Sequence, residues 1–282
     1  MMRRKGRKLL SAVLLVVFLC SSGIVVSRFL ASGAARDSYA DAAMLARPIP
    51  DSGPAETATQ PSPEENLTLP ARESRKVWVP VPVKEDPVME LLAATDLSAL
   101  REQNPDVVGW IHIPDTRIDY PILQGPDNDY YLNRNWLGQY QVVGSVFLEY
   151  RSDPGLTDYN TVVYAHNMAD GTMFHDLHKL NYPAYRGNIP YVYIVTDAGV
   201  LRYQVFSTYD AEVGGQAYSL DITNHDERAD FLTHALENSL FGLGVEPAVT
   251  DQILTLSTCS AIGYGHRRVV HARLAMMEVT LE

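Results

Sequence analysis

The chain has 282 residues, of which 46% are hydrophobic and 20% charged, which is enough for one sizeable globular core with additional segments. Its formal net charge is −11 at pH 7, and residues 31–282 hold 17 of the 23 basic residues and all 34 acidic ones. This acidic balance excludes binding along a nucleic-acid backbone. Of the two cysteines, only Cys259 lies outside an apolar N-terminal run, which excludes a disulfide framework.

The N-terminus has the pattern of a membrane anchor. The first eight residues carry five positive charges, and Leu9–Ser27 is uncharged and mostly apolar. At ~1.5 Å per residue a helix of this length spans about 30 Å, the thickness of a bilayer core. We therefore predict a cytoplasmic basic tail at residues 1–8, a single-pass transmembrane signal-anchor at residues 9–30, and an extracytoplasmic remainder. A cleaved signal peptide is the alternative, because residues 32–35 are small enough for a peptidase.

Residues 31–87 are predicted to form a Pro-rich extracytoplasmic stalk. Nine of the 17 prolines fall between Pro48 and Pro87, and proline opposes both helix and sheet. The one apolar patch, at residues 77–83, contains prolines that limit it to an extended edge or to polyproline II. We expect this segment to connect the membrane to a folded domain.

The folded domain is predicted to begin near Val88. Residues 88–103 have the apolar spacing of an amphipathic helix, which Asp96 and Ser98 interrupt, so the pattern fits one helix or two short ones. After Pro105 the apolar period becomes two. Segments with strand character follow at 107–113, 118–123, 144–149, 161–165, 189–196, 200–210, 252–258 and 267–280. About eight short strands with few helices indicate a mainly β fold, a closed or nearly closed antiparallel barrel.

Two helices are predicted among these strands. The first, at residues 173–179, is short. The second, at residues 226–240, precedes the penultimate strand and places apolar residues on one face, namely Phe231, Leu232, Ala235, Leu236 and Leu240. This second helix is predicted to be a packing element.

Cys259 stands at the end of a predicted strand and is a candidate nucleophile. Strand alternation puts Leu254, Leu256 and Thr258 on the barrel interior, and Thr255, Ser257 and Cys259 on the more polar outer face. In the last strand, Arg267 shares a face with Val269, His271 and Arg273, and this more polar face is also expected to point outward. The alternation therefore favours Arg267 over Arg268 as the arginine beside the thiol.

Three segments carry a resemblance to a known family. The first comprises N-P-D-V-V-G-W-I at 104–111, I-D-Y-P-I-L-Q-G at 118–125 and N-D-Y-Y-L at 128–132. The second is V-Y-A-H-N-M at 163–168, followed by G-T-M-F at 171–174. The third is T-L-S-T-C at 255–259, with Arg267 in the next strand. Together they resemble class B sortases, from about Val88 to the last residue.

The resemblance implies an eight-stranded sortase-type β-barrel with N-terminal helices and a helix before the penultimate strand, so that residues 88–282 form the catalytic domain. It also implies a cysteine transpeptidase without metal or cofactor. Cys259 would be the nucleophile, His166 the general acid and base, and Arg267 the donor that stabilises substrate and oxyanion. Ser257 and Thr258, next to the nucleophile, are predicted substrate contacts.

The implied partners are secreted proteins with a C-terminal sorting motif of the Pro-x-Thr type. The enzyme would cleave after the threonine through a thioacyl intermediate and pass the protein to an amine. That amine would belong to peptidoglycan or its lipid-linked precursor, and a pilin lysine is a further option. No nucleic acid is expected as a partner.

The sequence departs from the family pattern at two places. Ala165 stands where glycine commonly precedes the histidine, and residues 260–266 contain no acid.

His175 and His178 are three residues apart, a spacing that metal ligands can adopt. No H-E-x-x-H pattern supports a metal site, so we predict that both are solvated helix residues. Two other functions stay open: a cell-wall cysteine peptidase that transfers to water, and a non-catalytic peptide-binding barrel.

Overall fold

The computed structural model describes residues 33–47, 86–186, 191–260 and 265–279. The predicted tail and transmembrane anchor, and residues 48–85 of the predicted stalk, lie outside these ranges. Across the described ranges, no helix combines the length and the hydropathy of a bilayer-spanning segment.

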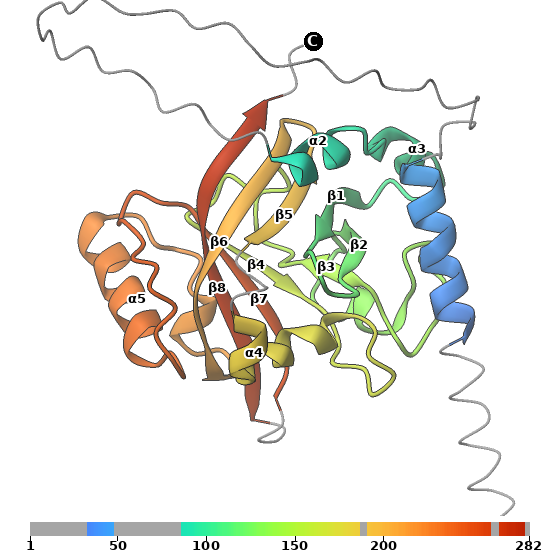
Figure 1. Cartoon of the computed structure of the whole chain (residues 1–282). Coiled ribbons are helices and arrows are strands. Elements are labelled where there is room, and N and C mark those ends of the chain that lie inside the picture. The colour runs from blue at the N-terminus through green and yellow to red at the C-terminus, as the bar shows by residue number, and fades with distance from the viewer. Residues whose placement is uncertain (1–32, 48–85, 187–190, 261–264, 280–282) are drawn as a thin grey trace, which may run out of the picture.

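Eight strands form a closed barrel, drawn in Figure 1. Around the barrel their order is β1-β2-β3-β4-β7-β8-β6-β5. Their bounds are β1 Val107–His112, β2 Asp119–Leu123, β3 Val146–Leu148, β4 Asn160–Tyr164, β5 Tyr191–Thr196, β6 Gly199–Glu212, β7 Ile253–Cys259 and β8 His266–Val279. The prediction of a mainly β, eight-stranded barrel is confirmed, and every predicted strand is present with its ends moved by a few residues.

The prediction that the barrel is antiparallel is wrong for two of its strand pairs. β2 pairs with β3 in parallel, and β4 pairs with β7 in parallel. A parallel pair requires a connection long enough to return the chain to the starting end. Residues 124–145 provide it between β2 and β3, and the whole of β5, β6 and α5 lies between β4 and β7. Strand periodicity alone contains no information on which strands become neighbours.

The predicted N-terminal helical stretch forms two short helices, α2 (Pro87–Ala93) and α3 (Leu97–Gln103). Asp86 caps α2 and Asp96 caps α3, each by accepting main-chain N–H groups of the first turn. The break at Asp96 is therefore a helix start. After β1, the chain forms the 3-10 helices η1 (Tyr130–Asn133), η2 (Phe174–Asn181) and η3 (Gln216–Tyr218), the short α4 (Pro183–Arg186) and α5 (His225–Glu237).

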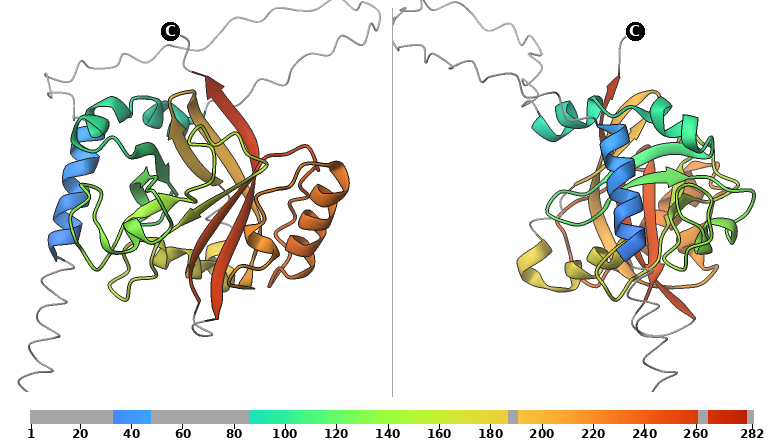
Figure 2. Two further views of the ribbon diagram at one scale, coloured as in Figure 1. Left: turned by 180° about the vertical axis from the view of Figure 1, so that it is seen from behind. Right: turned by 90° about the vertical axis from the view of Figure 1, so that its right-hand side faces the viewer.

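Residues 33–46 form a helix that packs on the barrel, where the sequence reasoning expected neither helix nor sheet. Ala35, Tyr39, Ala42 and Ala46 are buried at helical spacing along one face. The Tyr39 hydroxyl donates to the Gly144 carbonyl at 2.7 Å. Residues 33–46 are free to form a helix because the prolines of this region begin only at residue 48. In Figures 1 and 2 this helix, in blue, lies on the opposite side of the barrel from α5.

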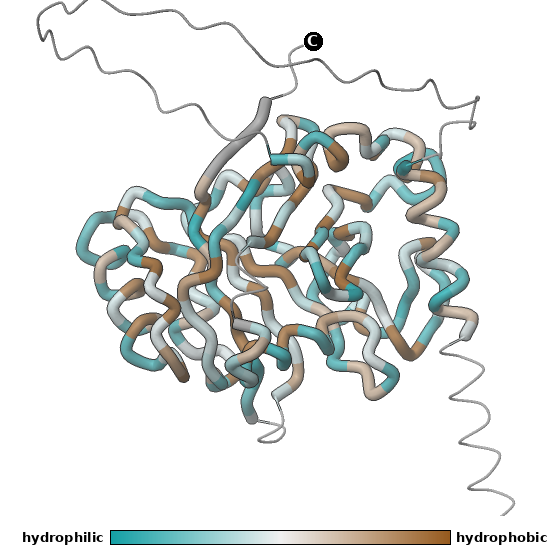
Figure 3. Tube along the Cα trace, viewed as in Figure 1, coloured by the Kyte–Doolittle hydropathy of each residue, from teal (hydrophilic) through white to brown (hydrophobic). Residues whose placement is uncertain are grey.

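Two hydrophobic clusters hold the domain together. The larger fills the barrel and extends under the helix at 33–46, and the smaller lies outside the barrel beneath α5. Figure 3 shows the hydrophobic residues concentrated along the strands. In α5, Phe231, Leu232 and Ala235 are buried as predicted, but Leu236 and Leu240 are 41% and 53% exposed. The helix ends at Glu237, so Leu240 is not part of its face.

We predict that Tyr39→Ala lowers the free energy of unfolding by about 3–5 kcal/mol, as expected for a buried aromatic side chain replaced by alanine. Met44→Ala, on the exposed side of the same helix, should change it by less than about 0.5 kcal/mol. Urea unfolding followed by circular dichroism measures both. Equal effects of the two variants would show that this helix does not pack on the barrel.

Candidate active site

The parallel pairing of β4 with β7 brings His166 and Cys259 together, although 93 residues separate them. Parallel neighbours reach the same edge of a sheet, and Tyr164 of β4 pairs with Ser257 of β7. The Ala165 N–H continues the pairing by donating to the Ser257 carbonyl at 3.2 Å. His166 and Cys259 each follow two residues after this Tyr164–Ser257 pair, so both lie at the same end of the barrel.

Cys259 is the single exposed residue of β7, whose other six residues are buried. Leu254 and Leu256 belong to the cluster inside the barrel, and Ile253 belongs to the cluster beneath α5. The predicted division between inner and outer faces therefore holds. The outer face, however, is covered by the segment between β6 and β7 and reaches solvent only at Cys259.

His166 is held in one tautomer by a main-chain carbonyl. Its Nε2 lies 2.8 Å from the carbonyl oxygen of Leu132. Because a carbonyl oxygen can only accept, Nε2 carries the hydrogen and Nδ1 is left to face the thiol. Leu132 belongs to η1, in the loop between β2 and β3, so this loop orients the imidazole.

The electrostatics of the pair favour a thiolate beside an imidazolium. The hydrogen bond with His166 lowers the pKa of the Cys259 thiol, and the positive charge of Arg267 lowers it further, against the effect of partial burial. The same hydrogen bond with Cys259 raises the pKa of His166, and the Leu132 carbonyl adds to this increase. A lowered thiol pKa is the property that makes a cysteine reactive near neutral pH.

The two neighbouring arginines have different environments. Arg267 is the direct partner of Cys259 in the β7–β8 pair, is half-buried and lines the cleft that contains the thiol. Arg268 points the other way and is buried, with two hydrogen bonds to Asp210 at 2.8 and 3.1 Å and one to Asn181. The register that favoured Arg267 as the residue beside the thiol is confirmed.

A cleft of about 460 Å³ runs past the thiol. Its lining includes Leu132, Tyr164, His166, Tyr218, Cys259 and Arg267. Ser257 and Thr258 also reach its wall but are almost fully buried, and the Ser257 hydroxyl is hydrogen-bonded to Tyr218 at 3.0 Å.

Several cleft residues were not singled out by the sequence reasoning. Leu132 is the last residue of the N-D-Y-Y-L motif at 128–132, so the family resemblance could have pointed to it. Tyr218 lies in η3, in a segment with no periodic pattern, and nothing in the sequence pointed to it.

The prediction that His175 and His178 are solvated is wrong, since both are half-buried. His175 contacts Asn167, and His178 contacts Asn167 and the Cys259 carbonyl.

A chain of buried polar groups includes Thr255 of β7, the strand that ends at Cys259. The Thr255 hydroxyl donates to Asn160 Oδ1 at 2.6 Å, so its oxygen must accept from His271 Nδ1 at 2.9 Å. His271 Nε2 is then an acceptor for the Tyr209 hydroxyl at 3.2 Å. His271 is fully buried, and this burial lowers its pKa to about 3, which keeps the ring neutral. These hydrogen bonds link β4, β7, β8 and β6.

The polypeptide is similar to known proteins in both sequence and fold. A family model for the sortase domain matches residues 111–275, more than half of the sequence. Sortase B of Listeria monocytogenes is 36% identical over 167 residues, covering 58% of this chain and 67% of that protein. Sortase B of Staphylococcus aureus is 31% identical over 161 residues, covering 57% of this chain and 66% of that protein. The solved S. aureus sortase B–substrate complex aligns with a TM-score of 0.61 and 30% identity over 64% of this chain and 85% of its own.

We predict that iodoacetamide alkylates Cys259 with a pH midpoint below that of a free cysteine, about 8.5. In His166→Ala the midpoint should move to higher pH, because the hydrogen bond that stabilises the thiolate is lost. Mass spectrometry of the peptide that contains Cys259 separates this label from any on Cys20. His112→Ala, a change to a half-buried histidine in β1 remote from the thiol, is the control. An unchanged midpoint in His166→Ala would contradict the assigned pairing.

We further predict a pH-dependent stability term from His271. Its folded-state pKa of about 3 lies below the value of about 6.5 expected in the unfolded chain, so only the unfolded state binds this proton between the two values. Unfolding free energy should therefore fall with decreasing pH by about 1.4 kcal/mol per unit more in the wild type than in His271→Gln. Urea titrations at pH 6.5, 5.5 and 4.5 measure the two slopes. Identical slopes would contradict a neutral buried ring.

Proposed function

Because the chain belongs to the sortase family, class B, and is therefore a cysteine transpeptidase, we propose that Cys259, His166 and Arg267 are its catalytic residues. The observation that supports this most directly is the position of Cys259. It is the one exposed residue of a buried strand, with His166 hydrogen-bonded to its thiol and Arg267 opposite it in the strand pair. Residues 88–282 would then constitute the catalytic domain.

In the first half-reaction, the Cys259 thiolate attacks the carbonyl carbon of the threonine in the sorting motif. The peptide C–N bond breaks, and the imidazolium of His166 gives its proton to the departing amine. The product is a thioester on Cys259. Arg267 donates hydrogen bonds to the oxyanion that forms during the attack, a contribution typically worth about 2.7–4 kcal/mol.

In the second half-reaction, an acceptor amine attacks the thioester and forms a new amide bond. Neutral His166 takes the proton of the attacking amine, and the Cys259 thiolate leaves. The tautomer set by the Leu132 carbonyl suits both steps, because the same Nδ1 atom can give and take the proton. The thiolate and the imidazolium are both regenerated at the end of the cycle.

Sortases act on proteins that carry a sorting motif, and the solved S. aureus relative was captured with substrate. For this chain we propose a Pro-x-Thr-type motif bound in the cleft, with Ser257 and Thr258 in its wall. The acceptor would be an amine of peptidoglycan or of its lipid-linked precursor. The enzyme would work at the cell surface, held by the single-pass anchor that residues 9–30 predict.

We predict that the intact chain in detergent cleaves fluorogenic Pro-x-Thr peptides and that Cys259→Ala abolishes the cleavage. With an added amine, such as triglycine, the product should be an amide. A product that is free acid even at high amine concentration would indicate a hydrolase. Absence of both turnover and a thioacyl adduct over a broad peptide set would indicate a binding barrel.

The arginine pair provides a matched comparison. Arg267→Ala should reduce kcat/KM by about 10²–10³, the loss typical of one oxyanion donor, with an unchanged Tm. Arg268→Ala should lower the unfolding free energy by about 3–5 kcal/mol, because it leaves the carboxylate of Asp210 buried without its partner. Thermal melts and peptide kinetics on both variants measure this. A stable Arg267→Ala enzyme with full activity would contradict the assigned role.

A further inference from the structure

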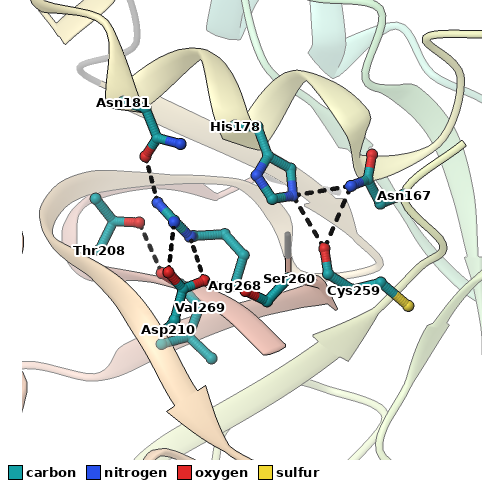
Figure 4. A network of polar contacts seen from close by, with 9 residues as sticks. All are labelled: Asn167, His178, Asn181, Thr208, Asp210, Cys259, Ser260, Arg268 and Val269. Carbon is teal, nitrogen blue, oxygen red and sulfur yellow. Dashed lines mark hydrogen bonds and ion pairs between the residues drawn. The ribbon is translucent and has the colours of Figure 1, made fainter. Parts of the chain in front are cut away.

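Two side chains hold the main-chain carbonyl of Cys259 on the side away from the thiol. His178 Nε2 lies 3.0 Å from this carbonyl oxygen, and Asn167 Nδ2 lies 3.3 Å from it. Figure 4 shows both side chains meeting at the carbonyl while the sulfur points in another direction. His178 comes from η2, and Asn167 comes from the loop after β4.

The hydrogen positions in this group follow from its acceptors. Asn167 Oδ1 lies 2.9 Å from His175 Nδ1, so the amide group is oriented with its oxygen toward His175 and its nitrogen toward the Cys259 carbonyl. The carbonyl can only accept, so His178 must carry its hydrogen on Nε2. Asn167 and His178 are then two donors to one oxygen, which explains the close approach of their nitrogens at 3.1 Å.

The residue after the nucleophile is held as well. The Ser260 hydroxyl donates to Asp210, a residue of β6. Asp210 is fixed by the buried Arg268, which also reaches Asn181 at the end of η2. These contacts, drawn in Figure 4, connect η2 to β8, the neighbour of β7, and through it to β6. The segment that supplies His178 is thereby attached to β6 and β8.

We propose that Asn167 and His178 are positioning residues, which fix the Cys259 main chain so that the thiol stays against His166. The proposal rests on the assignment of Cys259 as the nucleophile. β7 ends at Cys259, and strand ends fray unless other contacts hold them. His166 and Asn167 are consecutive, so one stretch of chain contacts the same cysteine at both its thiol and its carbonyl.

A proton-transfer role does not suit His178. Its Nε2 donates to a main-chain oxygen, whereas the thiol is hydrogen-bonded to His166. Burial lowers the pKa of His178, and the nearby charge of Arg268 adds to this, which outweighs the hydrogen bond to the Cys259 carbonyl and the charge of Asp210. The ring is therefore neutral at neutral pH and serves as a hydrogen-bond donor only.

The test compares three variants of the intact chain in detergent. His178→Phe keeps the ring volume and removes the donor, Asn167→Ala removes the second donor, and His178→Gln retains an N–H at similar reach. The matched control is His112→Phe, which removes a half-buried histidine of β1 that is hydrogen-bonded to Asp119 of β2. Each variant is measured for peptide kcat and KM, for Tm, and for the pH midpoint of Cys259 alkylation by iodoacetamide.

We expect His178→Phe and Asn167→Ala to lower kcat by about tenfold to hundredfold, the loss that misplacement of a reacting atom by about 1 Å causes. KM should change little, because neither side chain lines the cleft. The alkylation midpoint should move to higher pH as the thiol loses its fixed place beside His166. His178→Gln should restore most of kcat, and His112→Phe should leave kcat and the midpoint unchanged.

A reduced Tm with an unchanged kcat and alkylation midpoint in both donor-free variants would overturn the proposal and leave a purely structural role. Equal losses in His178→Gln and His178→Phe would also overturn it, because the donor would then be irrelevant. The alkylation assay needs no turnover. A wild type that shows the low midpoint and its shift in the variants, but cleaves no peptide, would contradict the proposed function alone.

Discussion

The site depends on the parallel pairing of β4 with β7. Antiparallel neighbours would put the end of one strand beside the start of the other, and His166 would then lie a barrel length from Cys259. The parallel arrangement makes both strands end at one edge, where the two side chains follow the last paired residues by the same offset. The long excursion through β5, β6 and α5 is the connection that such a pair requires.

Reactivity is confined to one residue because both faces of β7 are covered. Inside, the strand packs in the barrel core, and outside it packs under α5 and η3. Only the last residue passes beyond both covers. In the neighbouring strand β8, Arg267 reaches the cleft, whereas Arg268 is buried within the fold as the partner of Asp210. A one-residue slip in β8 would turn each of these two arginines to the opposite face of the barrel wall.

The sequence predicted those features that depend on local pattern. The period-two segments predicted all eight strands, and alternation within β7 and β8 correctly put Cys259 and Arg267 on one face. The local pattern could not predict the parallel pairs, because which strands become neighbours in the barrel depends on the whole chain. The helix at 33–46 was missed because composition was averaged over a range whose prolines begin at residue 48. His178 was misjudged because its partner, a main-chain carbonyl 81 residues away, has no signature in side-chain pattern.

His166 lies beside Cys259 in only one register of β4 against β7. A series of buried, hydrogen-bonded polar groups helps to specify that register. A one-residue slip would turn every inward side chain outward, and hydrogen bonds between buried groups add a further penalty against it. Asn160, Thr255 and His271 bond in sequence across β4, β7 and β8, and Asn160 Nδ2 also donates to two carbonyls beside η3. A slip by one residue would leave these groups buried without partners, at a cost of about 1–3 kcal/mol for each. A slip that brought Asn167 to the place of His166 would also set an amide, in place of the imidazole, against the thiol. The hydrogen-bonded polar groups toward the other end of β4 thus help determine which of two consecutive side chains meets the Cys259 thiol.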